Sequence, residues 1–226
     1  MLRSLISGGD FISTVIYILS SLTVIFLTLP VHEFAHGWAA VKLGDNTPRW
    51  QGRLTLNPFA HIDWIGALSI LIFGFGWAKP VQINHRNFRN PKRDMAITAL
   101  AGPISNLLMA LIALLLSNVV DLIFTRFFTV NIVFYYLTYF LYWIAMINVS
   151  LAVFNLIPIP PLDGSRVLSA VLPNKYYYAI MRYERYSFLL LILLLYSGIL
   201  SLPLNFLSDV VLTGLKALAA LPFKLF

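Results

Sequence analysis

The chain has 226 residues, of which 59% are hydrophobic and only 11% are charged, and its mean hydropathy is +0.81. A soluble domain averages about 25% charged residues, so this composition indicates a membrane protein. The absence of cysteine excludes disulfide bonds, thiolate metal ligands and a cysteine nucleophile. The net charge is +7, but the basic residues lie in loops between apolar runs, which suits anionic lipid headgroups better than nucleic acid.

Apolar runs along the chain predict the membrane helices. A spanning helix needs about 20 apolar residues, and four segments are long enough: 11–31, 95–120, 131–157 and 186–208. The stretch 64–78 has only 15 residues and three glycines, which suggests a re-entrant or surface-lying piece. The tail 209–226 is either an interfacial amphipathic helix or a final short span. We therefore expect an all-α polytopic membrane protein with about four to six membrane helices.

The basic residues predict how these helices are oriented. Eight Lys or Arg lie between positions 42 and 93 and four between 166 and 185, whereas the other side holds only Arg3 and Arg126. The positive-inside rule places the two loops that are rich in Lys and Arg in the cytoplasm. Because a crossing by 64–78 would weaken this asymmetry, we expect that stretch to enter and leave on the cytoplasmic side.

Two short segments beside that stretch have a strand-like pattern. Residues 53–56 and 81–84 alternate polar and apolar side chains, and Pro58 and Pro80 mark their ends. They predict a small cytoplasm-side β element. An edge of this element could hold an unwound substrate segment as an added strand.

The motif His32-Glu33-Phe34-Ala35-His36 follows the first apolar run directly. Two histidines four residues apart lie on one face of a helix and can share a zinc ion, and the adjacent glutamate can act as general base. Ionisable groups are costly in a membrane segment, so their presence there points to function. The motif predicts an intramembrane metalloprotease.

A catalytic zinc site usually has three protein ligands, so one more must come from elsewhere. The candidates are His61, His85 and the acidic residues, and Asp163 is the strongest. Charge placement puts Asp163 at the cytoplasmic end of its helix. Lys42 follows His36 by six residues, about 9 Å along a helix, so both halves of the site are expected at similar depth.

Together with further motifs, these residues make the chain resemble the site-2 protease family of intramembrane zinc metalloproteases. The resemblance is carried in order by residues 32–36, 57–63 (NPFAHID), 76–81 (GWAKPV), 102–106 (GPISN) and 155–164 (NLIPIPPLDG). It implies one Zn²⁺ per chain, held by His32, His36 and Asp163, with Glu33 as the catalytic acid and base. It also implies that Asn155 and Asn106 contact substrate or order the site.

The resemblance further implies a biological setting. The expected substrate is a transmembrane segment of a membrane-anchored protein, cut near the cytoplasmic face, and no nucleic-acid partner is expected. The chain lacks the PDZ insert and the regulatory domain of some relatives, so it resembles a minimal member: one domain over 1–226, with a core at 11–166 and C-terminal helices at 186–226. This minimal form suggests a prokaryotic inner membrane.

Two alternatives are weighed against this interpretation. One is a membrane zincin of another family with a glutamate as third ligand, but the only other glutamate, Glu184, lies in no such motif. The other is a membrane zinc-binding transporter or scaffold without proteolysis. A transporter would carry more polar residues along its spans than the run 95–120 does.

Overall fold

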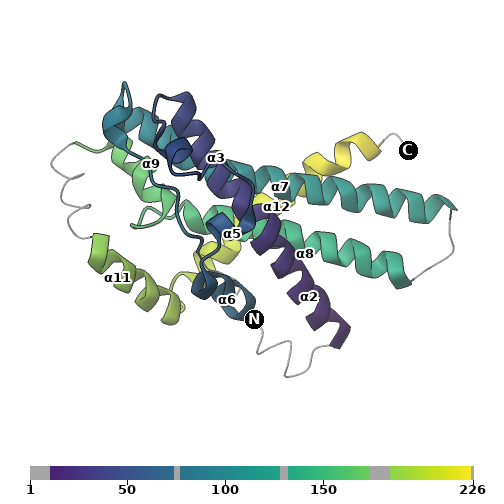
Figure 1. Ribbon diagram of the computed structural model, residues 1–226. Helices are drawn as coiled ribbons and strands as arrows, with labels where there is room; N and C mark the ends of the chain where they lie inside the picture. The colour runs from purple at the N-terminus through teal and green to yellow at the C-terminus, as the bar shows by residue number, and fades with distance from the viewer. Residues whose placement is uncertain (1–10, 74–76, 128–131, 174–183, 225–226) are drawn as a thin grey trace.

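The computed structural model describes residues 11–73, 77–127, 132–173 and 184–224, and most of these are helical (Figure 1). Within this part of the chain, four helices are long and apolar enough to cross a membrane, and they are Phe11–Lys42, Pro91–Thr125, Ile132–Asn155 and Ser201–Phe223. The prediction of an all-α polytopic membrane protein is confirmed.

The first span is one continuous helix in three parts. Helix α2 (Phe11–Thr23) leads into a π-helical turn, η1 (Val24–Thr28), and α3 (Leu29–Lys42) completes the span. Pro30 directly follows the π-helical turn as the second residue of α3, and because proline has no N–H, the continuous helix lacks one backbone hydrogen bond at this point. The motif at residues 32–36 therefore lies in the second half of this candidate membrane span.

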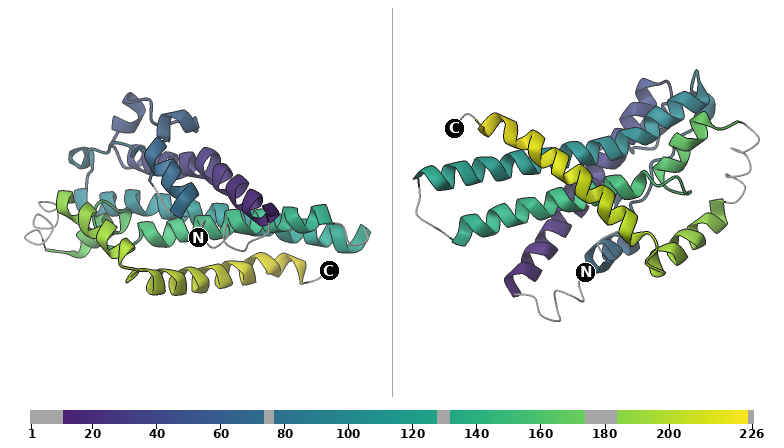
Figure 2. Two further views of the ribbon diagram at one scale, coloured as in Figure 1. Left: turned by 90° about the horizontal axis from the view of Figure 1, so that it is seen from below. Right: turned by 180° about the vertical axis from the view of Figure 1, so that it is seen from behind.

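An antiparallel helix pair forms the centre of the molecule. Helix α7 (Pro91–Phe127) packs along α8 (Ile132–Asn155), and they contain the predicted spans 95–120 and most of 131–157. Figure 2 shows α2 and α3 crossing one face of this pair, while α12 (Ser201–Ala220) crosses the opposite face. Buried alanines on α7 and α8 allow this close packing, and among them are Ala110, Ala113, Ala145 and Ala152.

The C-terminal part corrects the prediction of one span over 186–208. The structure has two helices there: α11 (Glu184–Tyr196) ends before Gly198, whose positive φ of 76° closes the turn, and α12 begins at Ser201. Pro203 lies in the first turn of α12, where a helix tolerates it. The fourth candidate span, Ser201–Phe223, is thus formed by α12 and the 3-10 turn η3 (Leu221–Phe223), so the tail belongs to this span up to Phe223. Residues 225–226 lie outside the described part.

The prediction of a small β element is wrong, because the residues that the structure describes contain no strand. The loops instead hold four short helices, and they are α4 (Thr47–Trp50), α5 (Pro58–His61), α6 (Trp64–Phe73) and η2 (His85–Asn87). Segment 81–84 is extended but unpaired, because the N–H of Val81 donates to Glu33 Oε2 and that of Asn84 donates to Asp45 Oδ2. Pairing of a substrate strand with this segment stays a prediction.

Helix α6 forms the first part, residues 64–73, of the apolar stretch 64–78 that is too short for a span. It has 10 residues, about half of what a membrane crossing requires. Residues 74–76 of the stretch lie outside the described part. Gly66 on α6 packs directly against the chain that returns at Trp77, because a Cβ added to Gly66 would lie 1.9 Å from the Trp77 carbonyl oxygen.

Asp45 ties the end of α3 to the segment 81–87. Its side chain is fully buried and accepts hydrogen bonds from the Thr47 and Asn84 backbone N–H groups and from Asn87 Nδ2. Burial alone would raise the pKa of this carboxyl, but the hydrogen bonds from Thr47, Asn87 and Asn84 outweigh it, so the pKa of Asp45 is lowered.

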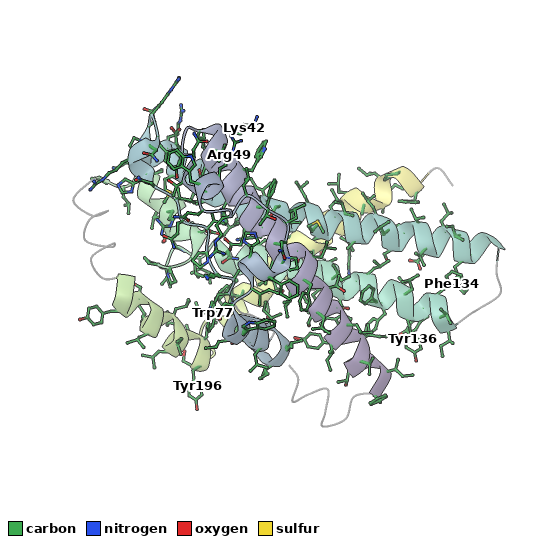
Figure 3. The ribbon with its side chains drawn as sticks, viewed as in Figure 1. Lys42, Arg49, Trp77, Phe134, Tyr136 and Tyr196 are labelled. Atoms are coloured by element: carbon green, nitrogen blue, oxygen red, sulfur yellow. The ribbon has the colours of Figure 1, made fainter. Side chains whose placement is uncertain are left out.

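The charged and aromatic ends of the molecule lie apart. In Figure 3, Lys42 and Arg49 lie at the end where α3 finishes, whereas Phe134 and Tyr136 lie toward the end where α7 and α8 are joined. Lys42 and Arg49 therefore lie at the opposite end of the helix bundle from Phe134 and Tyr136. Arg3, Lys175 and Arg182, which also entered the charge count, lie outside the described residues.

Candidate metal centre

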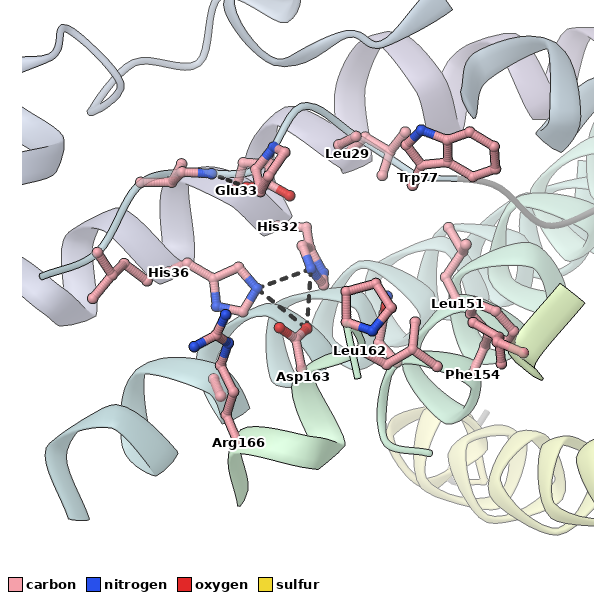
Figure 4. A pocket seen from close by; sticks show the side chains of 18 of the residues that line it. Leu29, His32, Glu33, His36, Trp77, Leu151, Phe154, Leu162, Asp163 and Arg166 are labelled. Carbon is pink, nitrogen blue, oxygen red and sulfur yellow. Dashed lines mark hydrogen bonds and ion pairs between the residues drawn. The ribbon is translucent and has the colours of Figure 1, made fainter. Parts of the chain in front are cut away.

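Two helices bring the predicted zinc ligands together. His32 and His36 project from one face of α3, and Asp163 is the first residue of α9 (Asp163–Val171). The His32 and His36 Nε2 atoms lie 3.0 Å apart, and Asp163 Oδ2 lies 3.5 Å from the first and 3.3 Å from the second (Figure 4). The three side chains form the candidate metal-binding group among the described residues.

These distances fit a four-coordinate zinc ion. With zinc–ligand bonds of about 2.0–2.1 Å, two ligands of a tetrahedral site lie about 3.3 Å apart. The observed separations of 3.0, 3.3 and 3.5 Å bracket that value. Two imidazole nitrogens and a carboxylate oxygen are also the donor types that zinc prefers. The residues present therefore suit zinc with one position left for water or substrate.

Backbone groups hold two of the three ligands in place. The second ring nitrogen of His36, Nδ1, lies 2.7 Å from the Thr98 carbonyl oxygen, which fixes the ring so that Nε2 faces the centre. Asp163 is positioned by the turn before α9, where a Cβ added to Gly164 would lie 2.1 Å from the Leu156 carbonyl oxygen. Burial opposes ionisation of Asp163, but the neighbouring His36 and His32 outweigh it and lower its pKa.

Gly102 of α7 faces the two imidazoles from the other side. A Cβ at this position would lie 2.3 Å from His36 Nε2 and 2.5 Å from His32 Cε1. Any side chain at position 102 would therefore occupy space that the histidine rings fill. The glycine of the 102–106 motif thus has a direct steric role.

Glu33 lies beside the ligand group and is 7% exposed. Its Oε2 accepts a hydrogen bond of 2.9 Å from the Val81 backbone N–H. This contact fixes one carboxylate oxygen and joins the extended segment 81–84 to α3.

A cavity of about 400 Å³ opens over the ligand group. Its wall combines the three ligands with Glu33, the segment from Trp77 to Ile83 and apolar residues of α8 and α11. Asn155, at the end of α8, also lines the cavity. Figure 4 also shows Arg166, one turn after Asp163 on α9, beside His36 and Asp163.

Other residues singled out from the sequence lie elsewhere. Asn106 is 1% exposed and is not among the residues that line the cavity. His61 is fully buried, and its Nε2 lies 2.8 Å from the Thr55 carbonyl oxygen. His61 and His85 are not part of the metal-binding group.

Three contributors were not found by sequence reasoning. The Thr98 carbonyl and the Val81 N–H are backbone groups, so no side chain marks them. Arg166 follows Asp163 by three residues and shares its helix face, a spacing that could have drawn attention to it.

Comparison with known proteins agrees with this geometry. The family model for peptidase family M50 matches residues 20–196, which include every residue of the centre. The chain belongs to this family, the site-2 protease family. It is 37% identical to YwhC of Bacillus subtilis (strain 168), a predicted zinc metalloprotease, over 79% of this chain and 82% of YwhC.

Two relatives of lower identity share a smaller part of their length with this chain. Rip2 of Mycolicibacterium smegmatis, also a predicted zinc metalloprotease, is 29% identical over 75% of this chain and 63% of Rip2. The zinc metalloprotease MJ0392 of Methanocaldococcus jannaschii is 26% identical over 69% of this chain and 35% of MJ0392. No solved structure gives a significant match. Family membership and the apolar helices make this M50 protein an integral-membrane zinc metalloprotease.

Proposed function

We propose that this M50 protease is an intramembrane endopeptidase that cuts a transmembrane segment of a membrane-anchored protein near the cytoplasmic face. His32, His36 and Asp163 would hold the zinc ion, and Glu33 would be the catalytic acid and base. The observation that carries this proposal is the convergence of two Nε2 atoms and one carboxylate oxygen within 3.5 Å of one another, beside a buried glutamate.

The proposed chemistry divides between the metal and Glu33. Bound zinc would supply a Lewis acid that polarises the scissile carbonyl and makes water acidic enough to lose a proton near neutral pH. Glu33 accepts that proton and returns it to the leaving amine. Because the Val81 N–H holds Oε2, Oε1 is left for the proton, and the carboxylate does not have to reorient between the two transfers.

The substrate must reach the centre in an unwound form. The carbonyls of a transmembrane helix are engaged in backbone hydrogen bonds, so a segment has to leave its helix before attack. The cavity offers an extended wall, from Trp77 to Ile83, and the polar side chain of Asn155 to receive such a segment. The basic loop residues around Lys42 and Arg49 support a cytoplasmic location for the end of the molecule that holds the centre.

The test combines zinc content with cleavage of transmembrane peptides by the purified full chain in detergent. We expect one zinc per chain in the wild type and in Glu33→Gln, with cleavage only by the wild type. Asp163→Ala should lose or weaken zinc binding. Glu184→Gln, which changes the only other glutamate, serves as the matched control and should cleave normally.

The same experiment separates the proposal from its alternative. A zinc-binding transporter or scaffold would bind zinc but cleave no peptide, with or without the Glu33→Gln change. Equal cleavage by the wild type and Glu33→Gln would overturn the role of Glu33. Failure of the wild type to bind zinc after metal reconstitution would overturn the metal centre itself.

A further inference from the structure

Three buried polar atoms without a hydrogen-bond partner lie near the candidate metal centre. Among the residues that the structure describes, His32 Nδ1 and both amide atoms of Asn106, Oδ1 and Nδ2, are buried and unpaired. Asn106 is 1% exposed and His32 is 5% exposed, so solvent does not satisfy them. Buried polar groups are nearly always paired in folded proteins, so a missing partner for each needs an explanation.

Helix geometry places the Asn106 amide against the His32 ring. Gly102 touches this ring, since a Cβ on Gly102 would lie 2.5 Å from His32 Cε1, the atom bonded to Nδ1. Asn106 is four residues further along α7 and therefore lies on the same face. Side chains on a helix lean toward its N-terminus, so the Asn106 amide covers the turn at Gly102.

The two histidines differ in how their second ring nitrogen is held. His36 Nδ1 lies 2.7 Å from the Thr98 carbonyl oxygen, one turn before Gly102 on α7. His32 Nδ1 has no such acceptor in the described part of the chain. Metal-binding histidines almost always donate this N–H to a carbonyl or carboxylate, which fixes the tautomer and the ring orientation. Asn106 lies one turn after Gly102 on α7, and its unpaired side-chain carbonyl can serve as the equivalent acceptor for His32.

We propose that Asn106 is a positioning residue whose side-chain carbonyl accepts the Nδ1–H of His32 and so directs His32 Nε2 toward zinc. This inference rests on the proposed function, in which His32 is a zinc ligand. This hydrogen bond would pair two of the three unpaired atoms, His32 Nδ1 and Asn106 Oδ1. The role explains why Asn106 is buried behind the centre and does not line the cavity.

The chain offers a matched control in Asn148. This asparagine is also fully buried in a membrane helix, α8, but its Nδ2 donates to the Ile144 carbonyl oxygen of its own helix, and it is not among the residues that line the cavity. If disturbed packing lowered the zinc affinity, alanine at either asparagine position would lower it. If lost positioning of His32 lowered the zinc affinity, only Asn106→Ala would do so.

The experiment measures zinc affinity of the purified full chain by competition with a chelator, for the wild type, Asn106→Ala, Asn106→Asp, Asn148→Ala and His32→Ala. We expect Asn106→Ala to bind zinc about 10- to 100-fold more weakly. Asn106→Asp keeps an acceptor, so its affinity should equal or exceed that of the wild type. Asn148→Ala should match the wild type, and the melting temperature of each zinc-free form checks folding.

The variants separate failure of this inference from failure of the proposed function. Unchanged affinity in Asn106→Ala, together with loss of zinc in His32→Ala, would overturn the positioning role and leave the metal centre standing. Unchanged affinity in His32→Ala would overturn the centre itself. If Asn106→Ala does not fold, Asn106→Asp decides, because an affinity at least tenfold below the wild type would also overturn the inference.

Discussion

Substitution of Gly102 by alanine tests the packing of the metal centre most directly. The new Cβ would lie 2.3 Å from His36 Nε2 and 2.5 Å from His32 Cε1, whereas non-bonded heavy atoms prefer about 3.5–4.0 Å. At least one ring must therefore move by about 1 Å. Zinc–nitrogen distances tolerate about 0.2 Å, so the ligand set cannot keep its geometry. We expect zinc affinity about 10- to 100-fold lower and cleavage reduced by about 100-fold or more.

The assay for Gly102→Ala is zinc content and peptide cleavage in detergent, with Gly214→Ala as control. Gly214 lies in α12, where an added Cβ meets no described atom within 4 Å, so this variant should behave as the wild type. Alanine favours a helix over glycine by about 1 kcal/mol, so neither change weakens its own helix. Wild-type zinc binding and cleavage by Gly102→Ala would refute the steric argument.

Three other changes have defined outcomes. Gly164→Ala places a Cβ 2.1 Å from the Leu156 carbonyl oxygen, so it should displace Asp163 and lower zinc content, as metal analysis would show. Asp45→Asn should destabilise the protein by about 1.5–3 kcal/mol at neutral pH, because Asp45 accepts several hydrogen bonds as an anion. Since folding lowers the pKa of Asp45, its contribution is complete above about pH 4 and is lost as pH falls through the folded pKa, so melting curves of the two proteins should converge there. Zinc removal by a chelator should lower the melting temperature of the wild type but not of Asp163→Ala; free zinc at 100 times its Kd stabilises by about 2.7 kcal/mol.

Much of the fold and the metal centre could be predicted because both depend on signals that are local in the sequence. Apolar runs set the positions of α2, α3, α7 and α8, and the spacing of His32 and His36 sets their common helix face. Asp163 is distant in sequence, yet charge placement at the membrane surface predicted its depth. The structure brings its carboxylate to the histidines at 3.3 and 3.5 Å.

The remaining features could not be predicted because they depend on tertiary contacts. Alternation at 81–84 is typical of a strand, but the donors at Val81 and Asn84 are taken by Glu33 and Asp45 from distant positions. Similarly, the apolar run 186–208 hides a helix break, because Gly198 carries no polar signal and hydropathy alone does not register its left-handed backbone. A turn-focused reading of Gly198 and Pro203 could have found that break.

The π-helical turn Val24–Thr28 has a consequence for comparing this chain with others. A π turn closes its hydrogen bonds over five residues instead of four. The first span therefore contains one residue more than a regular α-helix in which α2 and α3 present the same faces to the rest of the molecule. Deleting one residue within this turn would let it close as an α-helix, while a deletion inside α2 would rotate the start of the span by about 100° relative to the histidine face. A one-residue gap between the N-terminal apolar run and the paired histidines is therefore compatible with the same metal centre in another chain.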